Sequence, residues 1–133
     1  MNHDGEIIAT LCSALPDLLA IYRFGSHGTA GERAGSDIDL AVLGRALFDS
    51  GALWDLSQGL AMKLGREVDL LDLATASTVL QAQIVTHGER IFCSDPIYGD
   101  SYADYILSAY ARLNEERRDI LTDVLSRGSV YGS

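Results

Sequence analysis

The stretch that decides the fold of this chain is Phe24-Gly25-Ser26, followed by ten residues and then Asp37-Ile38-Asp39-Leu40-Ala41-Val42-Leu43. An apolar run ends at Gly25 and Ser26, so these two residues are predicted to form a tight polar turn. Side chains alternate between the two faces of a strand, so Asp37 and Asp39 leave one face while their apolar neighbours enter the core. The stretch therefore predicts two core strands, with a pair of carboxylates at the start of the second.

The paired aspartates indicate a metal site. Two neighbouring carboxylates repel each other unless a positive charge neutralises them. Hard oxygen ligands of this kind suit magnesium or manganese. Taken singly, Gly25-Ser26 is an ordinary turn, and Asp37 or Asp39 is an ordinary surface residue. Together, a turn that can hold phosphate and a carboxylate pair that can hold a cation predict a site for a metal–nucleotide complex.

A third carboxylate lies in the short apolar run from Glu67 to Leu73, which follows Gly65 and is typical of a strand. If this strand pairs beside the one that starts at Ile38, Asp69 joins the first two aspartates. Three carboxylates can hold two magnesium ions, one with the triphosphate and one that lowers the pKa of an attacking hydroxyl. Asp72 falls on the opposite face by alternation and is expected to end the strand. The alternative to a metal-binding role is that Asp69 is an ordinary carboxylate on a solvated strand face.

The combination of Gly25-Ser26, Asp37-Ile38-Asp39 and Val68-Asp69-Leu70 resembles the DNA-polymerase-β-like nucleotidyltransferase superfamily over roughly residues 5 to 95. The short chain looks most like its minimal nucleotidyltransferase (MNT) branch, the antitoxins of HEPN/MNT toxin–antitoxin modules. The resemblance implies that Gly25 and Ser26 bind the phosphates of ATP. It also implies that Asp37, Asp39 and Asp69 are the catalytic residues and hold magnesium, with two ions expected.

The same resemblance implies an activity and a partner. AMP would pass from Mg-ATP to a hydroxyl, expected to be a tyrosine, of a cognate HEPN ribonuclease toxin. This modification would neutralise the toxin within a hetero-oligomeric complex. One position departs from the pattern, because many relatives carry arginine directly after Gly-Ser and this chain has His27. Arg23 and Arg33 are the alternatives for a basic phosphate contact.

Two other functions are compatible with the sequence. The chain could be an antitoxin that neutralises its partner by binding alone, with a vestigial nucleotide site. It could also transfer a nucleotide to a small molecule such as an aminoglycoside, but such enzymes typically need a further substrate domain. A chain of 133 residues has little room for one.

Composition excludes several classes of protein. Ten Lys and Arg residues face nineteen Asp and Glu residues, for a formal net charge of −9 at pH 7. A nucleic-acid binder needs a basic surface to displace counterions, so direct binding of DNA or RNA is not expected. No membrane span or signal peptide is predicted. Cys12 and Cys93 are expected to be buried reduced thiols, which favours the cytoplasm.

Hydrophobic patterning predicts an α/β (α+β) fold, with a small mixed β-sheet flanked by helices and a C-terminal helix. Residues 1–95 would form the nucleotidyltransferase domain, and residues 96–133 a helical extension packed on that domain or on a partner. Ser50 is expected to cap the second helix, and either Thr75 or Ser77 to start the third. The expected helices cover 6–15, 52–64, a segment ending at His87, and 102–126; the expected strands cover 18–24, 38–43, 67–71 and 90–93.

Aromatic residues give two further expectations. Tyr98, Tyr102 and Tyr105 would share a helical face if the last helix begins early enough. Packing on the domain and docking of a partner protein are equally compatible with this face. Trp54 is expected to be a core or interface anchor rather than a platform for stacking bases.

Overall fold

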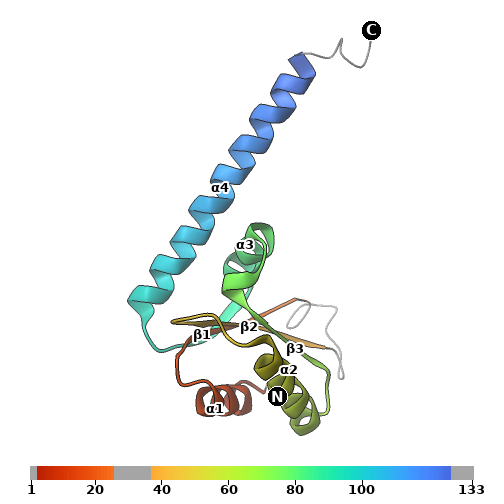
Figure 1. Cartoon of the computed structure of the whole chain (residues 1–133), viewed down its shortest axis with the longest axis vertical. Coiled ribbons are helices and arrows are strands. Elements are labelled where there is room, and N and C mark those ends of the chain that lie inside the picture. Colours follow the sequence, from red (N-terminus) through yellow and green to blue (C-terminus); the bar gives the residue numbers. More distant parts are fainter. Residues whose placement is uncertain (1–2, 26–36, 127–133) are drawn as a thin grey trace.

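The computed structural model describes residues 3–25 and 37–126 (Figure 1). These residues form one four-stranded sheet with the strand order β3-β2-β1-β4. The elements along the chain are α1 (Asp4–Ala14), β1 (Leu18–Phe24), β2 (Ile38–Gly44), α2 (Ser50–Leu64), β3 (Val68–Asp72), the 3-10 turn η1 (Leu73–Thr75), α3 (Thr78–His87), β4 (Glu89–Cys93) and α4 (Pro96–Ser126). The predicted mixed sheet flanked by helices is therefore confirmed.

Strand directions in the sheet follow from the connections. β1 pairs antiparallel with both β2 and β4, whereas β2 pairs parallel with β3. A parallel pair needs a crossover, and α2 provides it. The parallel register pairs Asp39 with Asp69, and the antiparallel register pairs Phe24 with Asp39. Three neighbouring strands thus meet at one level of the sheet.

The two faces of the sheet are covered by different helices. One face packs against α1 and α2, around Ile7, Leu11 and Leu60. The other packs against α3 and the first half of α4, around Ile84 and Ile106. Figure 1 shows α1 and α2 on one side of the sheet and α3 on the other. The alternation of side chains along each strand supplies both cores.

The residues predicted to end or start helices are only partly confirmed. Gly65 closes α2 with a left-handed φ of +68°, and its N–H donates to Ala61 O at 2.9 Å. Ser77 caps α3, since its hydroxyl accepts from Leu80 N at 3.2 Å. The prediction for Ser50 is wrong, because Asp49 is the N-cap of α2 and accepts from Ala52 N at 2.9 Å. A carboxylate there also favours the positive end of the helix dipole.

Helix α4 begins at Pro96, six residues before the expected start, and its two halves differ. The first half packs on the sheet and α3, with Gly99 and Ile106 buried. Every residue from Glu115 to Ser126 is exposed, and Figure 1 shows this half extending beyond the other elements. The predicted tyrosine face is present, with ring centroids 6.3 Å apart for Tyr98–Tyr102 and 6.0 Å for Tyr102–Tyr105.

The two cysteines are free, as predicted, but both are half-buried rather than buried. Their neighbours cover only part of each side chain, and burial nevertheless raises the pKa of the Cys12 thiol. No helix among the described residues is both long enough and apolar enough to cross a bilayer.

Candidate active site

The central pair of the predicted carboxylates lies side by side on neighbouring strands. Asp39 of β2 and Asp69 of β3 are partners in the parallel register. Neighbouring strands lie about 4.8 Å apart, and side chains at paired positions leave the same face. By alternation this is the face of Ala41 and Leu43, which is covered by α3 and α4 further along the strand. Asp39 is half-buried and Asp69 is exposed, so the pair lies where this cover ends.

Gly25 brings the end of β1 against Asp39. Its φ of +83° is in the left-handed region that favours glycine. A Cβ added there would lie 2.2 Å from Asp39 Oδ2 and 3.2 Å from Asp39 Cγ. No real side chain tolerates the shorter distance, so only glycine lets the turn approach Asp39 this closely. Ser26, the other predicted phosphate-binding residue, lies outside the described residues.

Asp37 precedes β2 and is exposed. The first hydrogen bond of the parallel pair anchors this point, since Ile38 N donates to Glu67 O at 2.9 Å. Within residues 3–25 and 37–126, no three His, Cys, Asp or Glu residues lie close enough together to hold a metal ion. The donor set is nevertheless of the right chemistry for magnesium, because carboxylate oxygens are its preferred protein ligands. Asp39 and Asp69 share one face, but the three aspartates do not form a compact cluster.

Asp72 ends β3, as predicted, and the structure gives it a structural role there. It is 5% exposed, and its two oxygens accept from Phe48 N and Ala74 N, each at 3.0 Å. The bond from Phe48 N holds the segment before α2 against β3, and the bond from Ala74 N caps η1. Each oxygen of this buried carboxylate thus accepts from a backbone N–H group, as expected of a buried polar side chain with a structural role.

Arg23, one of the two basic residues predicted as alternatives for a phosphate contact, does not lie at the carboxylate pair. Arg23 alternates with Tyr22 and Phe24 and lies on the opposite face, so the expectation that it contacts phosphate is wrong. Its guanidinium pairs with Asp4 of α1 and with Glu89 Oε2 at 3.2 Å. His27 and Arg33 lie outside the described residues.

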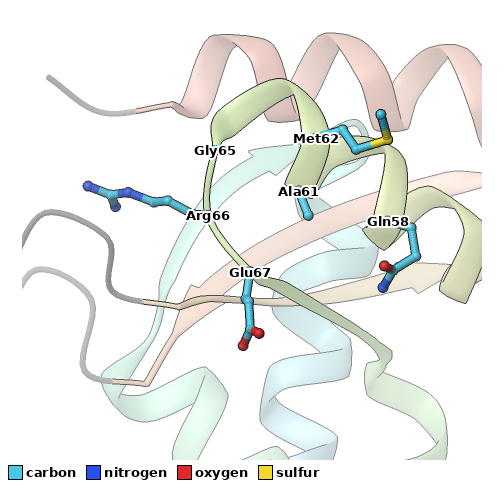
Figure 2. Close-up of a pocket in the computed structure, with 6 residues that line it drawn as sticks. All are labelled: Gln58, Ala61, Met62, Gly65, Arg66 and Glu67. Atoms are coloured by element: carbon cyan, nitrogen blue, oxygen red, sulfur yellow. The ribbon is translucent and has the colours of Figure 1, made fainter.

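Cavities lie at both ends of the carboxylate row. On the β1 side, a cavity of about 390 Å³ is lined by Phe24, Gly25, Leu80, Gln83, His87 and Gly88. On the β3 side, a cavity of about 250 Å³ is lined by Gln58, Ala61, Glu67, Val68 and Asp69. It shares Gln58, Ala61 and Glu67 with a neighbouring hollow of about 450 Å³ that continues past Met62, Gly65 and Arg66 (Figure 2).

Sequence reasoning missed the residues that α2 contributes to this second cavity. Gln58, Ala61 and Met62 belong to a helix that follows β2 in the chain, and nothing in their spacing points to the aspartates. Arg66 offered a weak signal, since it is a basic residue between the helix-ending Gly65 and the strand that carries Asp69. Only the parallel pairing of β2 with β3, which makes α2 the crossover helix, brings α2 to the edge of the sheet formed by β3.

Comparison with known proteins gives consistent matches. The sequence family described as "Polymerase beta, Nucleotidyltransferase" matches residues 6–97. The chain is 39% identical over 124 residues to a protein named "Protein adenylyltransferase MntA" from Shewanella oneidensis, covering 93% of this chain and 88% of that protein.

Two solved structures are similar over nearly the whole chain. One is a crystal structure of a toxin–antitoxin with AMP-PNP, with a TM-score of 0.81, 39% identity and coverage of 93% of this chain and 99% of that one. The other is a tri-AMPylated Shewanella oneidensis HEPN toxin in complex with its MNT antitoxin. There the TM-score is 0.76 and the identity 38%, covering 92% of this chain and 96% of the matched one.

Proposed function

This chain belongs to the polymerase-β nucleotidyltransferase family, and on that premise we propose that it is a protein adenylyltransferase antitoxin. It transfers AMP from ATP to a hydroxyl, expected to be a tyrosine, of a cognate HEPN toxin and thereby neutralises the toxin. The similar protein named as an adenylyltransferase, and the similar structures with AMP-PNP and with an AMPylated HEPN toxin, support this activity.

The observation that carries the proposal is the alignment of three functional groups across three strands. The Gly25 turn contacts Asp39, and Asp39 is the register partner of Asp69. A phosphate chain held at the turn would therefore extend toward the carboxylates. We assign Gly25 and Ser26 to the β- and γ-phosphates, whose charge backbone N–H groups of a turn can offset.

Asp37, Asp39 and Asp69 are the residues that would hold the metal ions. When bound there, magnesium would offset the charge of the triphosphate and lower the pKa of the attacking hydroxyl. In the reaction the acceptor oxygen forms a bond to the α-phosphorus, the bond from that phosphorus to the β-phosphate oxygen breaks, and pyrophosphate leaves. Asp69 would also accept the proton of the attacking hydroxyl.

Charge favours a protein acceptor over a nucleic acid. With a net charge of −9, the chain lacks the basic surface that polynucleotide binding requires. An acidic surface instead favours encounter with a basic partner, and an RNA-cleaving toxin is expected to be basic. We place the reaction in the cytoplasm, where ATP, magnesium and such a toxin occur together.

A second function, neutralisation by binding alone, is favoured by the outer half of α4. Ile120, Leu121 and Leu125 are each more than 60% exposed there, and an apolar helix face of this kind is typical of a protein interface. We therefore retain residues 96–133 as a proposed extension that packs on the domain through its first half and contacts the toxin through its second. The two functions differ in whether Asp39 is needed.

The test is to incubate the chain with α-labelled ATP, magnesium and the cognate HEPN protein. We expect label on the HEPN protein with wild type, and a loss of about 10²-fold or more with Asp39→Asn, which removes a negative charge but keeps the side-chain shape. Asp17→Asn is the matched control, because Asp17 is exposed at the opposite end of β1.

Toxin activity measured in parallel separates the two functions. Neutralisation that is lost with Asp39→Asn supports the transferase. Full neutralisation by Asp39→Asn, with no label transferred by wild type, would replace the transferase by the binding-only antitoxin.

A further inference from the structure

We propose that the cavity between β1 and the C-terminal end of α3 holds the adenine base of ATP, and that Gln83 recognises the edge of this base. We call this cavity the base pocket, defined by Phe24, Gly25, Leu80, Gln83, His87 and Gly88. The inference rests on the proposed function and adds a site for the part of the nucleotide that the glycine turn and the aspartates do not hold.

The base pocket lies on the face of the sheet that carries the carboxylate pair. Phe24 and Asp39 are register partners on neighbouring strands, so their side chains leave the same face. Phe24 and Leu80 pack against the core that α3 and α4 cover, on the side of the sheet opposite to α2 (Figure 1). The wall formed by Phe24 is therefore one strand spacing, about 4.8 Å, from Asp39.

Helix α3 covers the pocket. Leu80, Gln83 and His87 follow one another by three and four residues, so they lie along one side of the helix. Gly88 comes directly after the helix, and a Cβ added there would lie 3.0 Å from Arg23 O of β1. A side chain at this position would press on the strand. Glycine thus lets the end of α3 lie against β1, which closes the pocket on that side.

The geometry of the reacting phosphate lets the base lie on this side. In-line displacement places the acceptor oxygen and the departing pyrophosphate on opposite sides of the α-phosphorus. The ribose oxygen occupies a third position around the same phosphorus, so the ribose points toward neither of them. With the β- and γ-phosphates at Gly25 and the metal ions at Asp39, the ribose can lie over β1 and carry the base beneath α3.

The lining of the base pocket favours a neutral ring over an anion. Phe24 and Leu80 are apolar and half-buried, and none of the described residues that line the pocket is a lysine or an arginine. The pocket lies at the C-terminal end of α3, where the helix dipole places negative partial charge. The N–H of Gly88 already donates to Ile84 O at 2.8 Å. These features disfavour a phosphate, whereas a flat base can stack on the rings of Phe24 and His87.

Gln83 gives the pocket a preference for adenine. The volume of about 390 Å³ is in the range of small-molecule sites. A glutamine amide carries a donor and an acceptor side by side, and these pair with N7 and the amino group of adenine. The same edge of guanine carries two acceptors, so the amide oxygen would face O6 of guanine. We therefore expect the chain to bind ATP in preference to GTP.

The single tryptophan takes no part in this pocket. Trp54 belongs to α2, on the other side of the sheet, and it is 64% exposed. The core alternative for this residue is therefore excluded. Because the base pocket is on the opposite face, Trp54 does not stack on a base that is held there.

The first experiment measures the binding of AMP-PNP, GMP-PNP and inorganic triphosphate to the full chain, by calorimetry with magnesium present. Wild type should bind AMP-PNP more tightly than GMP-PNP. Gln83→Ala should weaken AMP-PNP binding about tenfold, because both hydrogen bonds to the base are lost, and should leave the binding of inorganic triphosphate unchanged. Alanine is the best helix former, so this variant is expected to fold. Thr86→Ala is the matched control, since Thr86 is exposed on α3 and does not line the pocket.

A second pair of variants distinguishes a base from a phosphate as the occupant. His87→Ala removes a ring and should weaken AMP-PNP binding about fivefold or more. His87→Phe keeps a ring and should retain the affinity of wild type. If both variants lose affinity for AMP-PNP and for inorganic triphosphate alike, the pocket holds a phosphate and the proposal is wrong.

AMP transfer to the intact HEPN protein separates the base pocket from the proposed function. In Gln83→Ala the KM for ATP should rise about tenfold with little change in kcat, because the base is held equally in the ground state and the transition state. If wild type transfers AMP while Gln83→Ala and His87→Ala match Thr86→Ala in KM and in AMP-PNP binding, the base pocket is wrong although the proposed function stands. If the expected losses of AMP-PNP binding occur but wild type transfers no AMP, the proposed function fails and the base pocket stands.

Discussion

The two faces of strand β2 show how one short segment serves both the core and the site. On the face toward α1 and α2, Ile38, Leu40 and Val42 are at most 1% exposed along the whole strand. On the opposite face, Ala41 and Leu43 are equally buried under α3 and α4, but Asp39 is half-buried and Asp37 exposed. Alternate residues of one strand thus meet a complete cover on one side and an incomplete cover on the other.

This difference separates what stabilises the chain from what it does. The complete face removes apolar surface from water along the whole strand and so stabilises the fold. The incomplete face contributes less to stability, but it leaves a row of charged and polar groups accessible to a ligand. A substitution on one face should therefore change unfolding, and a substitution on the other should change the reaction.

The largest expected effect on stability comes from the covered face. Leu40→Ala deletes a fully buried side chain next to Asp39, and such deletions lower the free energy of unfolding by about 2–5 kcal/mol. AMP transfer per folded molecule should change little, because Leu40 points away from the site. Urea denaturation gives the stability, and transfer is measured at a temperature where the variant remains folded.

Asp39→Asn, which changes the residue before Leu40 on the opposite face of the strand, is the variant with which Leu40→Ala is compared. A loss of transfer by folded Leu40→Ala as large as that by Asp39→Asn would contradict the separation of the two faces.

A smaller effect is expected where the backbone, rather than a side chain, shapes the incomplete face. Gly25→Ala places a Cβ in the left-handed region at a cost of about 1–2 kcal/mol, and this Cβ would overlap Asp39 Oδ2. Displacement of that carboxylate should lower transfer roughly 10²-fold, as misplacement by about 1 Å can. The measurements are thermal unfolding and initial rates of AMP transfer.

Gly65→Ala is the matched control for this variant. Gly65 also has a positive φ, but a Cβ there would meet nothing within 4 Å. A similar loss of stability with unchanged transfer is expected. If both glycine variants lose transfer equally, backbone strain alone accounts for the Gly25 effect.

The smallest effect concerns the cover that α4 provides on the same face. Tyr102 packs against the Ala41–Leu43 end of the core, and burial, with smaller contributions from Tyr98, Asp72 and Tyr105, raises its pKa above the ordinary 10.0. The folded state therefore holds the phenol proton more tightly than the unfolded state. The stabilisation is complete below the unfolded pKa of about 10 and is lost as the pH rises through the folded pKa.

The free energy of unfolding of Tyr102→Phe should accordingly decline less than that of wild type between about pH 9 and pH 11. Tyr105→Phe is the control, because Tyr105 is 65% exposed. An identical alkaline decline in wild type and Tyr102→Phe would show that α4 does not shield this part of the face.

Much of the fold could be predicted because the signals are local. The bounds of β1 agree with the prediction, and Gly65, Ser77 and Pro96 mark the ends or starts of elements through backbone geometry that each residue type imposes on itself. The error at Ser50 has the same origin, since Asp49 is an equally good cap one residue earlier. α4 begins six residues before the predicted start, and its first turn contains Gly99, a poor helix former that is buried there.

The candidate site was predictable in its residue types but not in its surroundings. Alternation by itself puts Asp37 and Asp39 on one face and Asp72 on the other from Asp69, because the period of two is a property of any strand. Asp69 lies beside Asp39 only because β2 and β3 pair in parallel. Local sequence patterns do not predict which strands pair. The role of Arg23 was mispredicted for the same reason, since its partners Asp4 and Glu89 are distant in sequence.

The sequence by itself determined the strands, most helix ends, the glycine turn and the identity of the aspartates, because these follow from interactions within a few residues. The tertiary structure alone decided which strands are neighbours, how far α3 and α4 cover the face that carries Asp39, and that α2 forms a cleft with β3 beside Asp69. These features depend on contacts between residues tens of positions apart, whose free energy is set by the packing of whole elements rather than by any local pattern.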